Sequence, residues 1–122
     1  MTGRYTRAKR RKDAIATIVK DYAGEALEVC FVGAYAMPTQ KAPVCKYVGT
    51  VGLLGDLMTI HTVDAAEGLN GRHTSKIVSI RLASSGLTLF GQYCKKCQIG
   101  VPAKFGNCQS CCSKLYVGSI YH

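Results

Sequence analysis

Acidic residues are scarce in this sequence and unevenly placed. There are only 7 aspartates and glutamates against 16 lysines and arginines, and the formal net charge is +9. All seven acids lie between residues 13 and 67, so residues 1–12 and 68–122 carry basic charge alone. Because like charges repel one another, segments of this kind usually face a polyanion. The composition therefore favours nucleic acid as a partner, with simple solubility as the alternative.

Long hydrophobic runs are also lacking. No stretch is long enough to span a membrane, and residues 1–7 lack the apolar segment of a secretory signal peptide. No basic amphipathic helix with a large apolar face supports binding to a membrane surface. We therefore expect an intracellular protein without a membrane partner, located in the cytoplasm or, in a eukaryotic host, in the nucleus.

The motifs of common enzyme families are absent. The sequence has no G-x-x-x-x-G-K-[ST] phosphate loop, no H-E-x-x-H motif, and no H-x-E ahead of its cysteine pairs. A cysteine–histidine hydrolase would need Cys30 or Cys45 beside His61 and an orienting acid, and no local motif surrounds these residues. We expect no catalytic activity.

Cysteine, in contrast, is abundant near the C-terminus. Cys94 and Cys97 form one C-x-x-C pair, and Cys108 and Cys111 form a second. Two such turns can surround one Zn²⁺ ion with four thiolates at Zn–S distances of about 2.3 Å. Because four thiolates leave no open coordination position, the spacing predicts a structural zinc ion. Cys112 is the alternative to Cys111 as the fourth ligand.

Two disulfides are the other interpretation of these four cysteines. They would need an oxidising compartment, which the absence of a signal peptide does not favour, and the total of 7 cysteines is odd. Metal binding is therefore the favoured interpretation. Gly100 follows the first pair, where a glycine is expected to supply the left-handed backbone that turns N–H groups toward the thiolates.

The segments Leu87–Tyr93 and Leu115–Tyr121 flank the cysteines and are strand-like, and we expect them to pair. With the two C-x-x-C pairs they resemble the zinc-ribbon family over about residues 87–121. In that family a glycine commonly follows the second cysteine of each turn, whereas Gln98 and Cys112 hold those places here. The resemblance implies a β-ribbon built around Zn²⁺. Zinc ribbons occur in RNA polymerase subunits, transcription factors, ribosomal proteins and single-strand-binding proteins, and as structural staples in enzymes.

The rest of the chain has the pattern of a small α+β protein. Asp13 to Tyr22 has helical periodicity, with Asp13 as the expected N-cap and Gly24 as the expected stop. The Asn70-Gly71 pair indicates a tight turn within a loop over residues 64–75. Apolar patterns of period two predict four strands, at residues 27–32, 44–48, 57–63 and 76–82.

These segments predict one domain in three parts. A basic arm (1–12) precedes an α+β core (13–86), in which one N-terminal helix lies on a small, mostly antiparallel sheet, and a zinc ribbon (87–122) follows. The order is also compatible with an oligonucleotide-binding (OB) barrel.

Basic side chains of the arm and the ribbon are the candidates for phosphate contact. We expect RNA or single-stranded nucleic acid, because no recognition helix for the major groove is evident near the ribbon and aromatic residues such as Tyr93 alternate with its lysines. The candidates are Arg7, Lys9, Arg10, Arg11, Lys12, Arg72, Lys95, Lys96 and Lys104. The alternative is a structural or assembly subunit of a nucleic-acid-containing particle, such as a viral coat protein, a cysteine-rich viral protein or a ribosomal component.

Overall fold

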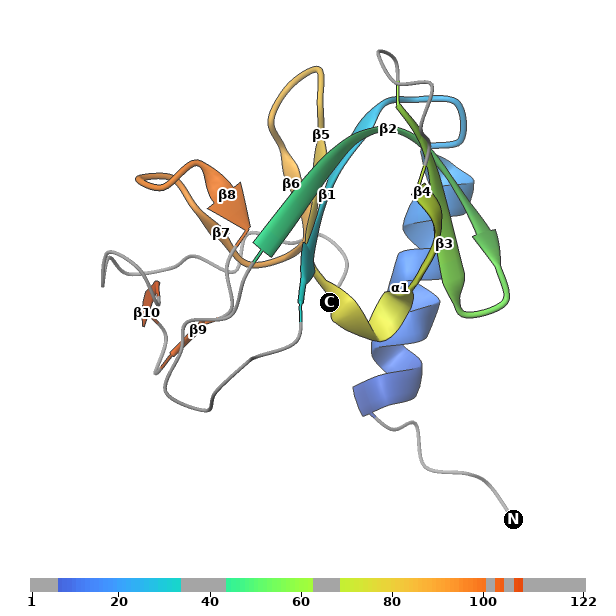
Figure 1. Ribbon diagram of the computed structural model, residues 1–122, viewed down its shortest axis with the longest axis horizontal. Coiled ribbons are helices and arrows are strands. Elements are labelled where there is room, and N and C mark those ends of the chain that lie inside the picture. Colours follow the sequence, from blue (N-terminus) through green and yellow to red (C-terminus); the bar gives the residue numbers. More distant parts are fainter. Residues whose placement is uncertain (1–6, 34–43, 63–68, 101–102, 105–106, 109–122) are drawn as a thin grey trace.

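A helix and a six-stranded antiparallel sheet make up the body of the protein (Figure 1). The computed structural model describes residues 7–33, 44–62, 69–100, 103–104 and 107–108. The helix is α1 (Arg7–Asp21), and a short 3₁₀ helix, η1 (Thr74–Lys76), separates the fourth and fifth strands. The strands are β1 (Leu27–Val32), β2 (Val44–Leu54), β3 (Leu57–Thr62), β4 (Leu69–His73), β5 (Ile77–Leu82) and β6 (Thr88–Gly91). The predicted α+β class is thus confirmed.

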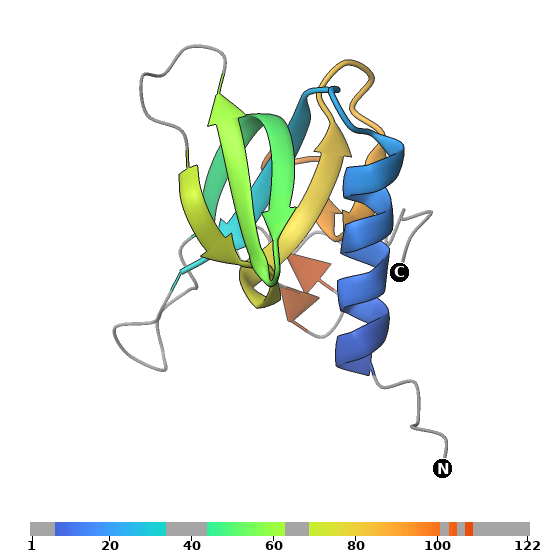
Figure 2. The same ribbon diagram turned by 90° about the vertical axis from the view of Figure 1, so that its right-hand side faces the viewer.

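The sheet is curved but open. Its strand order is β4-β3-β2-β1-β5-β6, so β4 and β6 are its edges, and Figure 2 shows α1 running alongside it. The sequence was also compatible with an OB-like barrel, but the sheet of the described residues is not closed into one. Nor does the described part of the chain contain a helix long and apolar enough to cross a membrane.

The helix begins earlier than the sequence pattern indicates. Asp13 lies inside α1 rather than at its N-cap, and its carbonyl oxygen accepts a 2.9 Å hydrogen bond from the Thr17 hydroxyl. Residues 7–12, half of the predicted arm, are therefore helical. Arginine, alanine and lysine are good helix formers. The sequence pattern did not show this first turn and a half, because the partners of Arg11 and Lys12 are Thr74, Ile77 and Asp56, which lie far away in the chain. The predicted end is confirmed, because Gly24 has φ +84° directly after the last turn.

The four predicted strands are confirmed, but β4 lies where a loop was expected. Met58 of β3 is paired with Arg72 of β4, and Ile60 is paired with Leu69. These two pairs are two residues apart along β3 but three residues apart along β4. One residue of β4 is therefore extra, and the Asn70-Gly71 pair forms a bulge rather than a hairpin turn. The prediction of a tight turn at this pair was wrong. An Asn-Gly pair readily adopts a positive φ, and this backbone conformation is needed in a hairpin turn and in a β-bulge alike.

One face of the sheet and one stripe of α1 form the hydrophobic core. Ile15 and Ile18 of the helix are fully buried in one cluster with residues of β1, β3, β5 and β6. Burying a side chain of this size stabilises the fold by about 1.5–3 kcal/mol. The sheet members of the cluster are Leu27, Val29, Phe31, Met58, Ile60, Ile77, Ile80, Leu89 and Phe90. Since side chains alternate along a strand, Glu28 and Cys30 of β1 and their partners in β2 and β5 point to the opposite face, which we call the outer face.

Candidate metal knuckle and nucleic-acid interface

The first cysteine pair forms the turn of a small hairpin. β7 (Tyr93–Cys94) pairs with β8 (Ile99–Gly100), and the residues between them make a knuckle. The backbone N–H of Cys97 donates to Cys94 Sγ at 3.4 Å, and the N–H of Gln98 donates to the Cys94 carbonyl at 2.8 Å. An N–H group aimed at a sulfur stabilises the negative thiolate, so the knuckle has a conformation suited to holding a metal.

Gln98, and not Gly100, provides the left-handed backbone of the knuckle. Gln98 has φ +57°, the only positive φ among the described residues other than glycine. The role expected for Gly100 was therefore wrong. Gly100 is instead required by close packing, because a Cβ there would lie 2.8 Å from the Cβ of Ser79 and 3.0 Å from the Cβ of Cys30.

The second cysteine pair is only partly described. β9 (Ala103–Lys104) pairs with β10 (Asn107–Cys108), which places the Cys108 backbone at the end of a second short hairpin. The positions of Cys111 and Cys112, and of the predicted strand at 115–121, lie outside the described residues. No three potential ligand side chains gather among the described residues, where Cys94 and Cys97 are the only members of the predicted set with described side chains.

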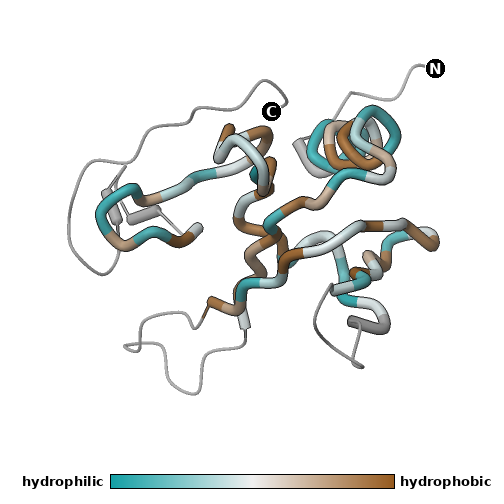
Figure 3. Tube along the Cα trace, turned by 90° about the horizontal axis from the view of Figure 1, so that it is seen from above, coloured by the Kyte–Doolittle hydropathy of each residue, from teal (hydrophilic) through white to brown (hydrophobic). Residues whose placement is uncertain are grey.

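The β7–β8 hairpin lies on the outer face of the sheet, opposite α1 (Figures 1 and 3). β8 contacts β1, β2 and β5. The chain reaches this face at Gly91, whose φ of +80° and whose contact with the Val78 backbone both exclude a side chain. A cleft of about 490 Å³ remains between the hairpin and the sheet. Its lining residues are Glu28, Lys46, Arg81, Tyr93, Lys95 and Gln98.

Arg81 organises this cleft. Its guanidinium lies 3.7 Å from the centroid of the Tyr93 ring and 3.2 Å from the Glu28 carboxylate, and its Nε donates to the Gly86 carbonyl at 3.1 Å. Burial raises the pKa of the Tyr93 hydroxyl. Lys46 and Lys95 are exposed at the same cleft. The cleft thus combines a fixed aromatic ring with three cations and one carboxylate.

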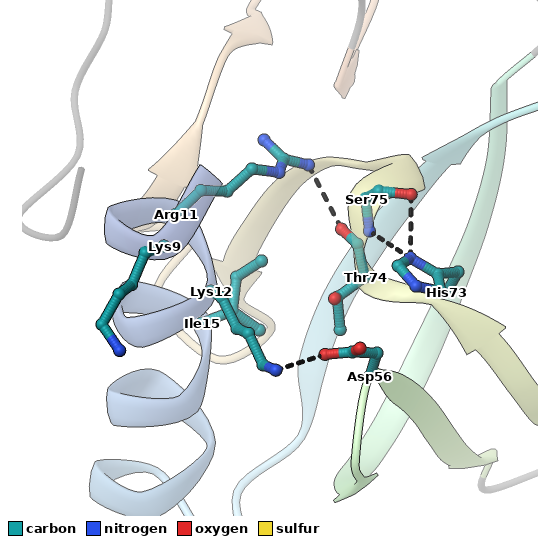
Figure 4. Close-up of a pocket in the computed structure, with 8 residues that line it drawn as sticks. All are labelled: Lys9, Arg11, Lys12, Ile15, Asp56, His73, Thr74 and Ser75. Atoms are coloured by element: carbon teal, nitrogen blue, oxygen red, sulfur yellow. Dashed lines mark hydrogen bonds and ion pairs between the residues drawn. The ribbon is translucent and has the colours of Figure 1, made fainter. Parts of the chain in front are cut away.

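The helical part of the predicted arm lies on the core side of the sheet, next to a second cavity of about 400 Å³ (Figure 4). Arg11 donates to the carbonyl oxygens of Thr74 and Ile77 and lies 5.0 Å from the Phe90 ring centroid, and burial lowers its pKa. Lys12 pairs with Asp56 at 2.7 Å, which raises the pKa of Lys12 and lowers that of Asp56. These two predicted phosphate contacts therefore join α1 to the sheet and to η1.

The remaining candidates do not gather at one surface. Arg72 shares the core face with Met58, and its guanidinium lies 5.6 Å from the Phe31 ring centroid and 5.8 Å from that of Tyr47. Its neighbour His73 accepts the Ser75 N–H at 3.1 Å and so caps η1. Exposed candidates are Lys9 and Arg10 on α1 and Lys95 and Lys96 on the knuckle. Only the backbone is described for Arg7, in α1, and for Lys104, in β9.

Sequence reasoning missed Lys46 and Arg81 as candidates. Each interrupts an apolar strand pattern, which marks it as facing away from the core. Register brings them together across β1, where Lys46 is paired with Cys30 and Arg81 with Glu28. The alternation of the strands could have placed each residue on the outer face. Only the strand order places them on the two strands that flank β1.

Comparison of this chain with protein-family models, with curated protein sequences and with solved structures found no match to any of the three.

Proposed function

We propose that this protein is a zinc-ribbon nucleic-acid-binding protein without catalytic activity, and that it binds single-stranded nucleic acid, RNA above all, in the cleft beneath the β7–β8 hairpin. The observation that carries the proposal is that Lys46, Arg81 and Lys95 line one cleft together with Tyr93, whose ring the Arg81 guanidinium contacts. These residues come from two strands of the sheet and from the knuckle. Their meeting reflects the tertiary fold rather than a local run of charge.

The zinc ion is proposed from the chemistry of the ligand set and the shape of the first knuckle. Cys94 and Cys97 provide two sulfurs on one turn, with one backbone N–H directed at Cys94 Sγ. Cys108 follows a second short hairpin, and Cys111 completes the set, with Cys112 as its alternative. When bound, the ion would hold the ribbon together and take no part in a reaction, since four thiolates saturate it.

The cleft has the groups that an unpaired nucleotide needs. A base can stack on the accessible part of the Tyr93 ring, which Arg81 holds from one side. The ammonium groups of Lys46 and Lys95 are exposed and can bind the flanking phosphates, while the Gln98 amide is available to base edges. A base paired within a duplex could not enter to stack, so single strands should be preferred.

Binding of a short fluorescent single-stranded RNA, measured by anisotropy on zinc-loaded protein, tests this function. Lys46→Ala/Lys95→Ala should weaken binding about tenfold or more. It should also reduce the salt slope by roughly 1.4, because each phosphate that a lysine no longer neutralises removes about 0.7. The matched control is Lys20→Ala/Lys76→Ala, which removes the same charge from exposed sites on α1 and η1. It should change affinity less than about threefold, or about 0.6 kcal/mol.

Equal losses of RNA affinity in the two double variants would contradict binding in the cleft. Such a result would mean that the RNA is held only by unspecific charge attraction. Absence of any RNA binding by the zinc-loaded protein would contradict the function itself. The alternative of a particle subunit predicts particle-sized species in gel filtration, whereas a binding module should elute as a small species.

A further inference from the structure

Among the described residues, a single acidic side chain lines the cleft beneath the β7–β8 hairpin. Glu28 lies there together with the cations of Lys46, Arg81 and Lys95. A carboxylate repels phosphate, so contact with a nucleic-acid backbone gives no reason for an acid at this place. Charge balance for Arg81 is one reason, because the charged groups of the pair are 3.2 Å apart and mostly buried. The position of the carboxylate relative to Tyr93 provides a second.

The Glu28 carboxylate lies near the ring on which a base would stack. Arg81 joins the two groups, since it donates to Glu28 Oε1 and its guanidinium lies 3.7 Å from the centroid of the Tyr93 ring. Burial raises the pKa of the Tyr93 hydroxyl, Arg81 lowers it, and the nearby charge of Glu28 raises it again. A base stacked on this ring therefore has a carboxylate within reach of its edge.

The carboxylate is also held in place. Glu28 lies on β1, between Val48 of β2 and Arg81 of β5, and Arg81 is itself anchored by the Gly86 carbonyl. Within the described residues the Glu28 carboxylate accepts its hydrogen bond at Oε1, and an ionised carboxylate has about four acceptor sites in all. An acceptor fixed before binding loses little entropy when a ligand arrives, and its hydrogen bonds are about twice as strong as neutral ones.

Guanine is the base whose edges fit this set of groups. Its N1–H and its N2 amino group are adjacent donors, which the two oxygens of one carboxylate can accept together. Its O6 and N7 atoms are acceptors, which lysine and arginine cations bind. Adenine and cytosine offer a carboxylate one amino group only. Uracil offers one N3–H between two carbonyl oxygens, which a carboxylate repels.

We propose that the cleft selects an unpaired guanine nucleotide and that Glu28 determines this specificity by accepting hydrogen bonds from N1–H and the N2 amino group. The inference rests on the proposed function, since the RNA must enter the cleft, but it does not depend on the zinc ion. Stacking on Tyr93 and phosphate contact with the lysines are common to all bases. Other sequences, oligouridine included, therefore still bind, but more weakly.

Anisotropy measurements with short fluorescent oligouridines that carry one exchanged nucleotide at the centre test this preference on the full chain. The central nucleotide is guanosine, inosine, adenosine, cytidine or uridine, so length and charge are matched. The guanosine oligonucleotide should bind about tenfold more tightly than the uridine one. Inosine lacks the N2 amino group and should bind about fivefold more weakly than guanosine, because one carboxylate oxygen then loses its donor.

Glu28→Gln removes the charge and one acceptor while it keeps the shape of the side chain. It should bind the guanosine and inosine oligonucleotides equally, and its preference for guanosine over uridine should fall below about threefold. The matched control is Glu25→Gln, which removes the same charge from an exposed position ahead of β1 and should keep the full preference. Each preference is a ratio within one variant, so a loss of stability that leaves the protein folded does not change it. The inosine comparison needs no variant and decides the matter if Glu28→Gln does not fold.

The proposal is overturned if the parent protein binds all five oligonucleotides with equal affinity, or if it prefers a base other than guanine. It is also overturned if Glu28→Gln still prefers guanosine to inosine, since the carboxylate would then only balance the charge of Arg81. In each of these cases RNA still binds, and the proposed function stands. Failure to bind any of the oligonucleotides would contradict the proposed function and this inference with it.

Discussion

Replacement of Arg81 by alanine should destabilise the protein strongly. Its side chain and that of Glu28 are only 18% and 16% exposed, and their charged groups are 3.2 Å apart. Removing one partner of a fully buried pair costs about 3–5 kcal/mol, because the other charge is left without compensation. The remaining exposure lowers that figure to about 2 kcal/mol, and the missing stacking on Tyr93 adds about 1 kcal/mol. We therefore expect the unfolding free energy of Arg81→Ala to fall by about 3 kcal/mol.

Urea unfolding of zinc-loaded protein, followed by circular dichroism, measures this loss. A double-mutant cycle with Glu28→Gln isolates the pair, and we expect a coupling energy of about 1.5–2 kcal/mol. The apolar double variant Glu28→Leu/Arg81→Met fills a similar volume without charge. It should be more stable than Arg81→Ala, because no carboxylate is left unpaired.

A loss below about 1 kcal/mol for Arg81→Ala would refute this reasoning. So would a coupling energy near zero. Either result would mean that the pair behaves as a solvated surface contact and that Arg81 does not organise the cleft.

Three further variants follow from the site. Gln98→Gly should tighten zinc binding severalfold in a competition assay with a chromophoric chelator, since the left-handed φ costs a non-glycine residue about 1 kcal/mol; unchanged affinity would show that Gln98 carries no such strain. Cys111→Ser should abolish stoichiometric zinc in elemental analysis and Cys112→Ser should retain it, whereas the reverse would make Cys112 the ligand. Burial raises the pKa of the Cys30 thiol in the folded protein. The contribution of the buried thiol to the unfolding free energy is therefore complete below the ordinary thiol pKa of about 8.5. It is lost as the pH rises from there toward the raised pKa, because the unfolded chain loses this proton first. Cys30→Ala should therefore flatten the decline of unfolding free energy in alkaline urea titrations, and parallel declines would contradict this assignment.

The elements that the sequence predicted are those with a complete local pattern. Ile15 and Ile18 lie close together on one helical face, and the apolar runs in Leu27–Val32 and Ile77–Leu82 mark strands. These patterns depend on neighbours in the chain, so a single sequence contains them.

The features that the sequence missed depend on partners elsewhere in the chain. Asn70-Gly71 supplies a positive φ that suits a turn or a bulge, and only the pairing of β4 with β3 decides between them. Gly100 was assigned to the backbone of the knuckle, whereas its need for space comes from Ser79 on another strand. Arg11 was placed in an arm because its carbonyl partners lie more than sixty residues away.

The central claim is that the cleft between the knuckle and the outer face holds the nucleic acid. Ultraviolet crosslinking of zinc-loaded protein to oligouridine, with the crosslinked peptides identified by mass spectrometry, tests it most directly, because a stacked base reacts with the ring that it covers. We predict a crosslink at Tyr93 that disappears in Lys46→Ala/Lys95→Ala and persists in Lys20→Ala/Lys76→Ala. Crosslinks confined to α1, with none at Tyr93, would contradict the claim.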